Sequence, residues 1–229
     1  MKTSIAVFDI DGTLTDSVAL HQTAFLRALE TFGFADLERD WSKYQHHSDS
    51  AIFAEVWACV GWNGPAPLVD LEDRYQEAFN EEMVKVELKE IPSAASFVAS
   101  LADSQWLPVF ATGSLRHGAT RKMTAVNLPY DDALLVSASE HETREDIVRQ
   151  AIRLGRAQLS QDQPDRIVSI GDGMWDLLTA KNLDVEFIGI ASGAKEEALT
   201  GAGAGARVLA DYAPYASPSE FFDLARKLP

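Results

Sequence analysis

The stretch Ile5-Ala-Val-Phe-Asp-Ile-Asp-Gly-Thr-Leu-Thr15 holds the strongest fold signal in the chain. Its apolar half predicts a short buried strand, and its polar half, with Asp9, Asp11 and Gly12, predicts the turn that ends the strand. Four more short apolar runs are predicted to be strands, at residues 107–112, 134–138, 166–172 and 187–191. Apolar runs without polar alternation are typical of strands buried on both faces. Together they predict a parallel sheet.

Helical patterns separate these strands, at residues 94–103, 121–128, 146–156, 174–182 and 219–227. The alternation predicts an α/β fold, a Rossmann-like parallel sheet core with helices on both faces. Pro108 is predicted to be the first residue of its strand, because proline inside a central strand removes a ladder hydrogen bond. The segment 201–205 lacks the spacing of a nucleotide-binding motif and is predicted to be a flexible loop.

Residues 16–89 interrupt the alternation, because their apolar side chains recur only at helical spacing. Three apolar stripes follow one another there, beginning at Val18, Ile52 and Leu68. A helical insert directly after the first strand predicts a lid over the end of the sheet where ligands bind. The expected division is an α/β core of residues 1–15 and 90–229 with a small all-helical cap domain of residues 16–89.

The composition excludes several classes of partner. Lys and Arg number 20 and Asp and Glu number 35, which gives a formal net charge of −15. A nucleic acid or an anionic membrane surface is therefore not expected as a partner. The one cysteine, Cys59, cannot form an intramolecular disulfide and is interpreted as a small core residue. No stretch has the length and hydrophobicity of a membrane span, and the protein is expected to be cytoplasmic.

Four acidic residues follow two of the predicted strands. They are Asp9 and Asp11, and Asp172 and Asp176 of Gly171-Asp-Gly-Met-Trp-Asp176. Two carboxylates about 4 Å apart repel each other by about 4 kcal/mol at an effective dielectric constant of 20, so such a cluster needs a cation. An all-oxygen ligand set with open positions suits Mg²⁺. The alternative for Asp9 and Asp11 alone is an ordinary strand-ending turn.

Two further segments are candidates for phosphate binding. Thr112 and Gly113 follow a predicted strand and offer a hydroxyl and a closely approachable amide, although this pair also suits an ordinary turn. Thr143 is predicted to cap a helix, which places Arg144 in its first turn, where a bound phosphate would favour it. The alternative for Arg144 is a solvated surface side chain. Lys122 is then the next basic candidate.

Taken together, these motifs resemble the haloacid dehalogenase-like hydrolases over essentially the whole chain, and their phosphoglycolate-phosphatase-like branch in particular. The resemblance implies a phosphatase in which Asp9 is the nucleophile and Asp11 is the acid–base residue with a raised pKa. Mg²⁺ would be held by Asp9, the Asp11 backbone carbonyl and Asp172. Asp176 would bind the metal through water or orient Arg144. Thr112, Gly113 and Arg144 would contact the phosphate of a small phosphorylated metabolite.

Other functions compatible with some of these residues remain open. A phosphohexose mutase of the same superfamily shares every motif. A 2-haloacid dehalogenase needs neither Mg²⁺ nor the second acid, so Asp11 and Asp172 argue against it. A metal-dependent glycosyltransferase also uses two acids at this spacing but leaves Asp172 and Asp176 without a role. A binding scaffold on a decayed enzyme fold is expected to have lost at least one of the acids, and none is lost.

The polar segment 44–49 lies between two helices of the predicted cap. In the resembling family a loop at this place faces the active site, so His47, or His46 if the loop turns the other way, is a candidate for contact with the leaving group. The alternative is that Ser48 or Asp49 only caps the helix that follows. No pattern in the sequence indicates which phosphate ester is the substrate or what the oligomeric state is.

Overall fold

The computed structural model of the protein describes residues 1–34, 36–62, 64–159, 161, 163–215 and 217–227. Within these residues seven strands form one sheet in the order β3-β2-β1-β4-β5-β6, with β7 paired to β5. All neighbours are parallel except β7, which is antiparallel to β5. The strands are β1 (Ser4–Phe8), β2 (Trp106–Ala111), β3 (Leu135–Val136), β4 (Ile167–Gly171), β5 (Glu186–Ile190), β6 (Val208–Leu209) and β7 (Arg226–Lys227).

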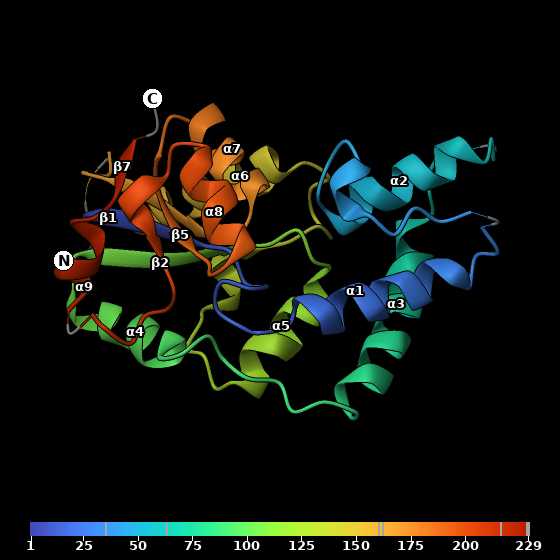
Figure 1. Ribbon diagram of the computed structural model, residues 1–229, viewed down its shortest axis with the longest axis horizontal. Coiled ribbons are helices and arrows are strands. Elements are labelled where there is room, and N and C mark those ends of the chain that lie inside the picture. The colour runs from blue at the N-terminus through green and yellow to red at the C-terminus, as the bar shows by residue number, and fades with distance from the viewer. Residues whose placement is uncertain (35, 63, 160, 162, 216, 228–229) are drawn as a thin grey trace.

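Helices cover both faces of this sheet, as Figure 1 shows. The helices of the α/β part are α4 (Ala94–Ser100), α5 (Arg116–Ala125), α6 (Arg144–Gln158), α7 (Met174–Asn182), α8 (Ala194–Gly201) and α9 (Pro218–Phe222). Along β1, Ile5 and Val7 belong to one hydrophobic cluster with α6, α7 and α8, whereas Ala6 and Phe8 belong to a second with α4, α5 and α9. Successive side chains of a strand point to opposite faces, so a strand covered on both sides must be apolar throughout. The predicted fold class is confirmed.

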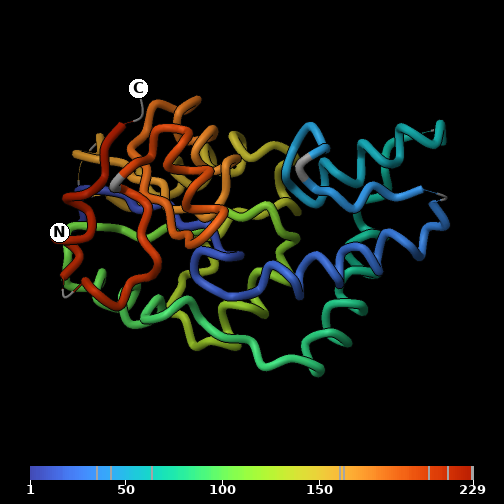
Figure 2. The backbone as a smooth tube through the Cα atoms, viewed as in Figure 1, coloured from blue at the N-terminus to red at the C-terminus, as the bar shows by residue number. Residues whose placement is uncertain are grey.

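The segment between β1 and α4 forms three helices, α1 (Val18–Glu30), α2 (Asp49–Cys59) and α3 (Leu68–Met83). They pack through the predicted apolar stripes, and the rings of Phe25 and Tyr75 meet at 6.4 Å between centroids. The chain leaves and re-enters the sheet region at one point, since Asp16 N donates to Lys89 O at 2.9 Å. We therefore propose residues 16–89 as the cap. Figure 2 shows the N-terminus and β7 at the end of the molecule opposite these helices.

Two predicted boundaries near the sheet need correction. Pro108 is the third residue of β2 and not its first. It is tolerated because β3 pairs only with Phe110 and Ala111, so β2 has a neighbour on one side only at the level of Pro108. The predicted helix over 219–227 is instead the short helix α9 followed by the strand β7.

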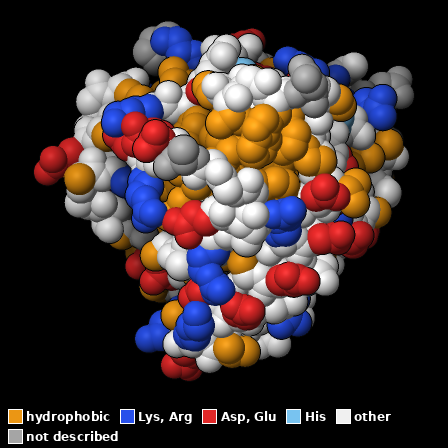
Figure 3. All heavy atoms as spheres, turned by 90° about the vertical axis from the view of Figure 1, so that its right-hand side faces the viewer, with side chains coloured by type: hydrophobic (Ala, Val, Ile, Leu, Met, Phe, Trp, Pro, Cys, Tyr) orange, Lys and Arg blue, Asp and Glu red, His pale blue; other side chains and the backbone are white. Residues whose placement is uncertain are grey.

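Two further predictions differ from the structure. The segment 201–205 is not one loop, because α8 runs to Gly201 and a 3₁₀ turn begins at Gly205. Cys59 is exposed and not in the core. It lies in the last turn of α2, where Ala58 and Val60 are also exposed, so this turn projects beyond the packed part of the cap. Figure 3 views this end of the molecule, where hydrophobic side chains gather.

Among the described residues, no helix combines the length and the hydrophobicity that a membrane span requires.

Candidate active site

The candidate site lies where β1, β2 and β4 end. These three strands are adjacent in the sheet and parallel, so the residues after them meet at one edge. Asp9 follows β1, Thr112 follows β2 and Asp172 follows β4. The chain order reverses between β1 and β4, and ligands of open α/β sheets bind at such a point.

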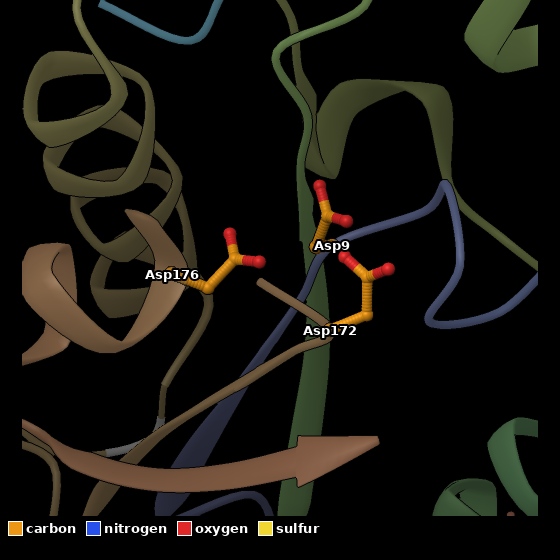
Figure 4. Close-up of side chains that lie close together, drawn as sticks. All are labelled: Asp9, Asp172 and Asp176. Carbon is orange, nitrogen blue, oxygen red and sulfur yellow. The ribbon is translucent and has the colours of Figure 1, made fainter. Parts of the chain in front are cut away.

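Three buried carboxylates form the floor of the site. Asp9, Asp172 and Asp176 each offer an oxygen within 4.8 Å of the others. In Figure 4 Asp9 and Asp172 approach from the ends of their strands, and Asp176 approaches from the start of α7. Burial and the charge of Asp9 raise the pKa of Asp172 to about 6. Burial also raises the pKa of Asp9 and of Asp176, although the Arg144 guanidinium opposes it. Such a set of oxygen ligands fits a divalent cation.

Gly12 makes room for this cluster. Its φ is +78°, in the left-handed region that favours glycine, and a Cβ atom here would collide with the carboxylate of Asp172. The place of Asp172, about 160 residues further along the chain, therefore requires glycine at position 12.

Arg144 joins the cluster from the first turn of α6. Thr143 caps this helix, as predicted, by accepting from Asp146 N. The Arg144 side chain is buried, and its Nη1 donates to Asp9 Oδ1 at 3.0 Å while Nη2 lies 3.3 Å from Asp176 Oδ1. Its Nε is buried and has no hydrogen-bond partner in the described part of the chain. An unpaired buried donor is costly, so this N–H is available for an acceptor that enters the site.

Asp11 has a separate environment. Lys122 Nζ lies 2.7 Å from Asp11 Oδ1, Ser114 Oγ donates to Oδ2 at 2.6 Å, and Ser17 Oγ donates to Oδ1 at 2.5 Å. Burial favours the neutral acid, but the Lys122 ammonium and these hydrogen bonds outweigh it and hold the pKa of Asp11 below its usual value. The expectation of a raised pKa is therefore wrong. The carboxylate of Asp11 also lies outside the group of three acids, in which Asp176 stands instead.

Thr112 and Gly113 follow β2, and Gly113 contacts the cap. Thr112 Oγ1 accepts from Ser114 N at 3.1 Å, which leaves its own hydroxyl proton free to donate. Gly113 O accepts from Asp49 N at 2.8 Å, and a Cβ atom on Gly113 would lie 2.5 Å from His47 O. Glycine is needed here because the cap loop packs directly against this backbone.

His47 lines the same cavity as Asp9, Thr112, Gly113 and Arg144, whereas His46 is not among its lining residues. The cavity has a volume of about 160 Å³. The His47 ring stacks on Trp175, with 4.6 Å between centroids. Burial and the nearby Arg144 guanidinium lower the pKa of His47.

Sequence reasoning missed two residues of this site and undervalued a third. Lys195, which follows β5, donates to Asp172 Oδ2, and Ser114 holds Asp11. Lys195 was findable as a basic residue just beyond a strand of the same sheet. Lys122, considered only as a substitute for Arg144, is fully buried against Asp11. Its position inside a helix carries no signal that it points toward the site.

The comparisons with known proteins agree with this architecture. A family model described as haloacid dehalogenase-like hydrolase matches residues 6–190. A search of curated proteins finds no match.

Solved structures with the same fold span most of the chain. CbbY from Rhodobacter sphaeroides, in complex with phosphate, is 21% identical with a TM-score of 0.71, covering 96% of this chain and 99% of its own. A HAD hydrolase of family IA, variant 3, from Entamoeba histolytica is 15% identical with a TM-score of 0.71 and covers 98% and 99%. A candidate β-phosphoglucomutase from Bacteroides vulgatus is 18% identical with a TM-score of 0.60 and covers 84% and 77%. At these identities the likeness establishes the fold.

Proposed function

Because the chain belongs to the haloacid dehalogenase-like hydrolases, we propose that it is a Mg²⁺-dependent phosphatase that hydrolyses small phosphomonoesters through an aspartyl phosphate on Asp9. The observation that carries this proposal is the unpaired Nε of Arg144, buried beside Asp9 and next to Gly113. Phosphate oxygens are strong acceptors for a guanidinium, and here one would lie beside the nucleophile.

The charges of the site support a divalent cation. Four carboxylates, Asp9, Asp11, Asp172 and Asp176, meet three cations, Arg144, Lys122 and Lys195. The entry of a phosphate dianion would add two negative charges to this excess. Asp9, Asp172 and Asp176, with the Asp11 backbone carbonyl, would hold Mg²⁺. When bound, the ion would neutralise charge on the phosphoryl oxygens as it spreads over them in the transition state.

In the first half-reaction Asp9 attacks phosphorus and forms an acyl phosphate as the ester oxygen leaves. Arg144 Nε–H, the Thr112 hydroxyl and the Gly113 amide would donate to the phosphoryl oxygens. Arg144 also favours the ionised form of Asp9, which the attack requires.

The proton balance belongs to the pair of Asp11 and Lys122. Asp11 is held ionised in this pair, and Lys122 Nζ lies within 2.8 Å of both of its carboxylate oxygens, so the ammonium is the proton source. Asp11 would take a proton from Lys122 and pass it to the leaving alcohol, then accept one from the water that attacks the acyl phosphate and return it to Lys122. Inorganic phosphate is released and the free carboxylate of Asp9 is restored. The cycle closes without another reactant.

The wall of the cavity favours hydrolysis over a mutase reaction. A phosphohexose mutase must hold a second phosphate on the substrate, and the cap residues that line the described cavity include no Lys or Arg. The net charge of −15 and the single cysteine agree with a small metabolite as partner and with the cytoplasmic location expected from the sequence.

The test is hydrolysis of 4-nitrophenyl phosphate by the purified protein with Mg²⁺. We expect turnover that EDTA abolishes and added Mg²⁺ restores, with Asp9→Asn as the inactive control. Full activity in EDTA would overturn the metal assignment, and equal activity of Asp9→Asn would overturn the nucleophile.

A further inference from the structure

The cavity above the phosphate position has walls of two kinds. On the cap side its lining includes the apolar side chains of Val18, Phe25, Trp41 and Ile52, and Trp175 closes it from α7. Phe25 and Trp41 lie 5.5 Å apart between ring centroids. These side chains present hydrocarbon and aromatic surface to whatever is esterified to the phosphate.

The ionisable cap groups in this wall are already paired. His21 Nε2 lies 3.0 Å from Asp49 Oδ1, and His21 Nδ1 lies 3.0 Å from Tyr75 OH. Asp49 Oδ2 accepts from Leu115 N at 2.8 Å. The two histidine contacts hold parts of the cap together, and the Asp49–Leu115 contact joins the cap to the core, so neither side chain is free for a substrate.

Gln22 is different. It lines the cavity from α1, and its side chain makes no hydrogen bond with any residue that the structure describes. Its amide is neutral, so this wall offers a polar contact for a single hydroxyl or carbonyl but no compensation for a charge.

Positive charge is confined to the floor of the site. Of the residues that line the described cavity, Arg144 and Lys195 carry it, and both contact the acidic cluster. His47 adds none at neutral pH, since burial lowers its pKa. A second anionic group on the substrate would lie among apolar rings with the Asp49 carboxylate nearby, and a buried charge without a partner is strongly unfavourable.

The size of the cavity limits the substrate further. This cavity, which includes the phosphate position, measures about 160 Å³. An apolar cavity of about 150 Å³ holds one molecule of the size of benzene, so the leaving group must be small. A polyol is disfavoured as well, because each buried hydroxyl without a partner costs about 1–3 kcal/mol.

We propose that the site selects phosphomonoesters of a small, uncharged and largely apolar alcohol, no larger than a single ring, and rejects esters that carry a second phosphate or a carboxylate. This proposal rests on the phosphatase function proposed above and specifies its substrate class.

The test compares benzyl phosphate with 4-carboxybenzyl phosphate, which differ in one remote charge and have leaving alcohols of similar acidity. We expect kcat/KM to be at least about tenfold higher for benzyl phosphate. Erythritol 4-phosphate and fructose 1,6-bisphosphate should fall below benzyl phosphate too. An equal or higher kcat/KM for any of these three esters overturns the proposal and leaves the phosphatase function intact.

A charge placed in the wall provides the second measurement. Gln22→Lys should raise the ratio of 4-carboxybenzyl to benzyl turnover by about tenfold. Gln22→Met, which adds no charge, should keep the preference for benzyl phosphate. Thr23→Lys adds the same charge at the neighbouring exposed position of α1 and should leave both rates unchanged. An unchanged ratio in Gln22→Lys contradicts the proposal.

Binding separates this proposal from the proposed function. If no ester is hydrolysed, the phosphatase assignment fails, and calorimetry with benzylphosphonate and 4-carboxybenzylphosphonate in the presence of Mg²⁺ still tests the wall. Tighter binding of benzylphosphonate supports the proposal. Equal or weaker binding of benzylphosphonate, or no binding of either compound, overturns it.

Discussion

Lys122 Nζ lies 2.7 Å from Asp11 Oδ1 and 2.8 Å from Oδ2, and the lysine side chain is completely buried. Asp9, two residues before Asp11, has its own partner in Arg144. The two acids of one short motif are thus paired with two different cations, which come from α5 and α6. In the proposed mechanism this separation places one carboxylate beside the phosphate and the other beside a proton source.

Loss of the cation beside Asp11 should affect esters with poor leaving groups most. Lys122→Met removes the ammonium, which is the proton source of the pair. We expect kcat/KM for benzyl phosphate to fall by about 10²-fold or more, within the range of general acid–base catalysis, and to fall less for 4-nitrophenyl phosphate. Steady-state kinetics with both esters measures the difference. Equal losses for both, with native circular dichroism, would contradict the role of the pair in proton transfer.

The two acids of the first motif should fail in different ways. Asp9→Asn removes the nucleophile, so no phosphoenzyme should form. Asp11→Asn keeps the nucleophile but lacks the base for the second step, so 4-nitrophenyl phosphate should give a burst of about one nitrophenolate per enzyme, followed by slow turnover. Rapid mixing and acid trapping of the phosphoenzyme test both variants. A phosphoenzyme in Asp9→Asn would mean that another residue is the nucleophile.

Arg144 should contribute both to binding and to the transition state. We expect Arg144→Ala to lower kcat/KM by about 10- to 1000-fold and Arg144→Lys to recover part of the loss, because lysine keeps the charge but not the planar fork. Arg149 lies five residues further along α6, and its side chain is exposed. Arg149→Ala is therefore the matched control and should behave as wild type. Wild-type kinetics in Arg144→Ala would show that this guanidinium does not contact the substrate.

The pH dependence of stability should include a contribution from His47. Its pKa is lowered in the folded protein by burial and by Arg144, so the folded state binds a proton less readily than the unfolded state. Stability is therefore lost as the pH falls below the unfolded value of about 6.5. Between pH 7.5 and pH 5.5 the midpoint of thermal unfolding should fall further in wild type than in His47→Gln. An identical decrease in both proteins would contradict the lowered pKa.

The fold and much of the site were predictable from local patterns. Nearly continuous apolar runs such as those within 5–10 and 166–172 are typical of strands covered on both faces. The helix over 174–182 was predicted at its observed bounds. Asp9 and Asp172 immediately follow strands, and parallel strands that lie side by side bring their ends together. The helical segment between β1 and α4 was also predictable, because a segment whose apolar residues recur only at helical spacing cannot add strands to the sheet.

Contacts between distant segments determined the rest. Lys122 faces Asp11, Lys195 faces Asp172 and Asp176 joins the acidic cluster only after the helices are packed against the sheet. The contact with Lys122 keeps Asp11 ionised. The pKa shift expected from the motif alone was therefore in the wrong direction. The exposure of Cys59 likewise depends on where the neighbouring helices end. Electrostatic energy and burial depend on distances through space, and separation along the chain does not encode those distances for residues that meet only in the tertiary structure.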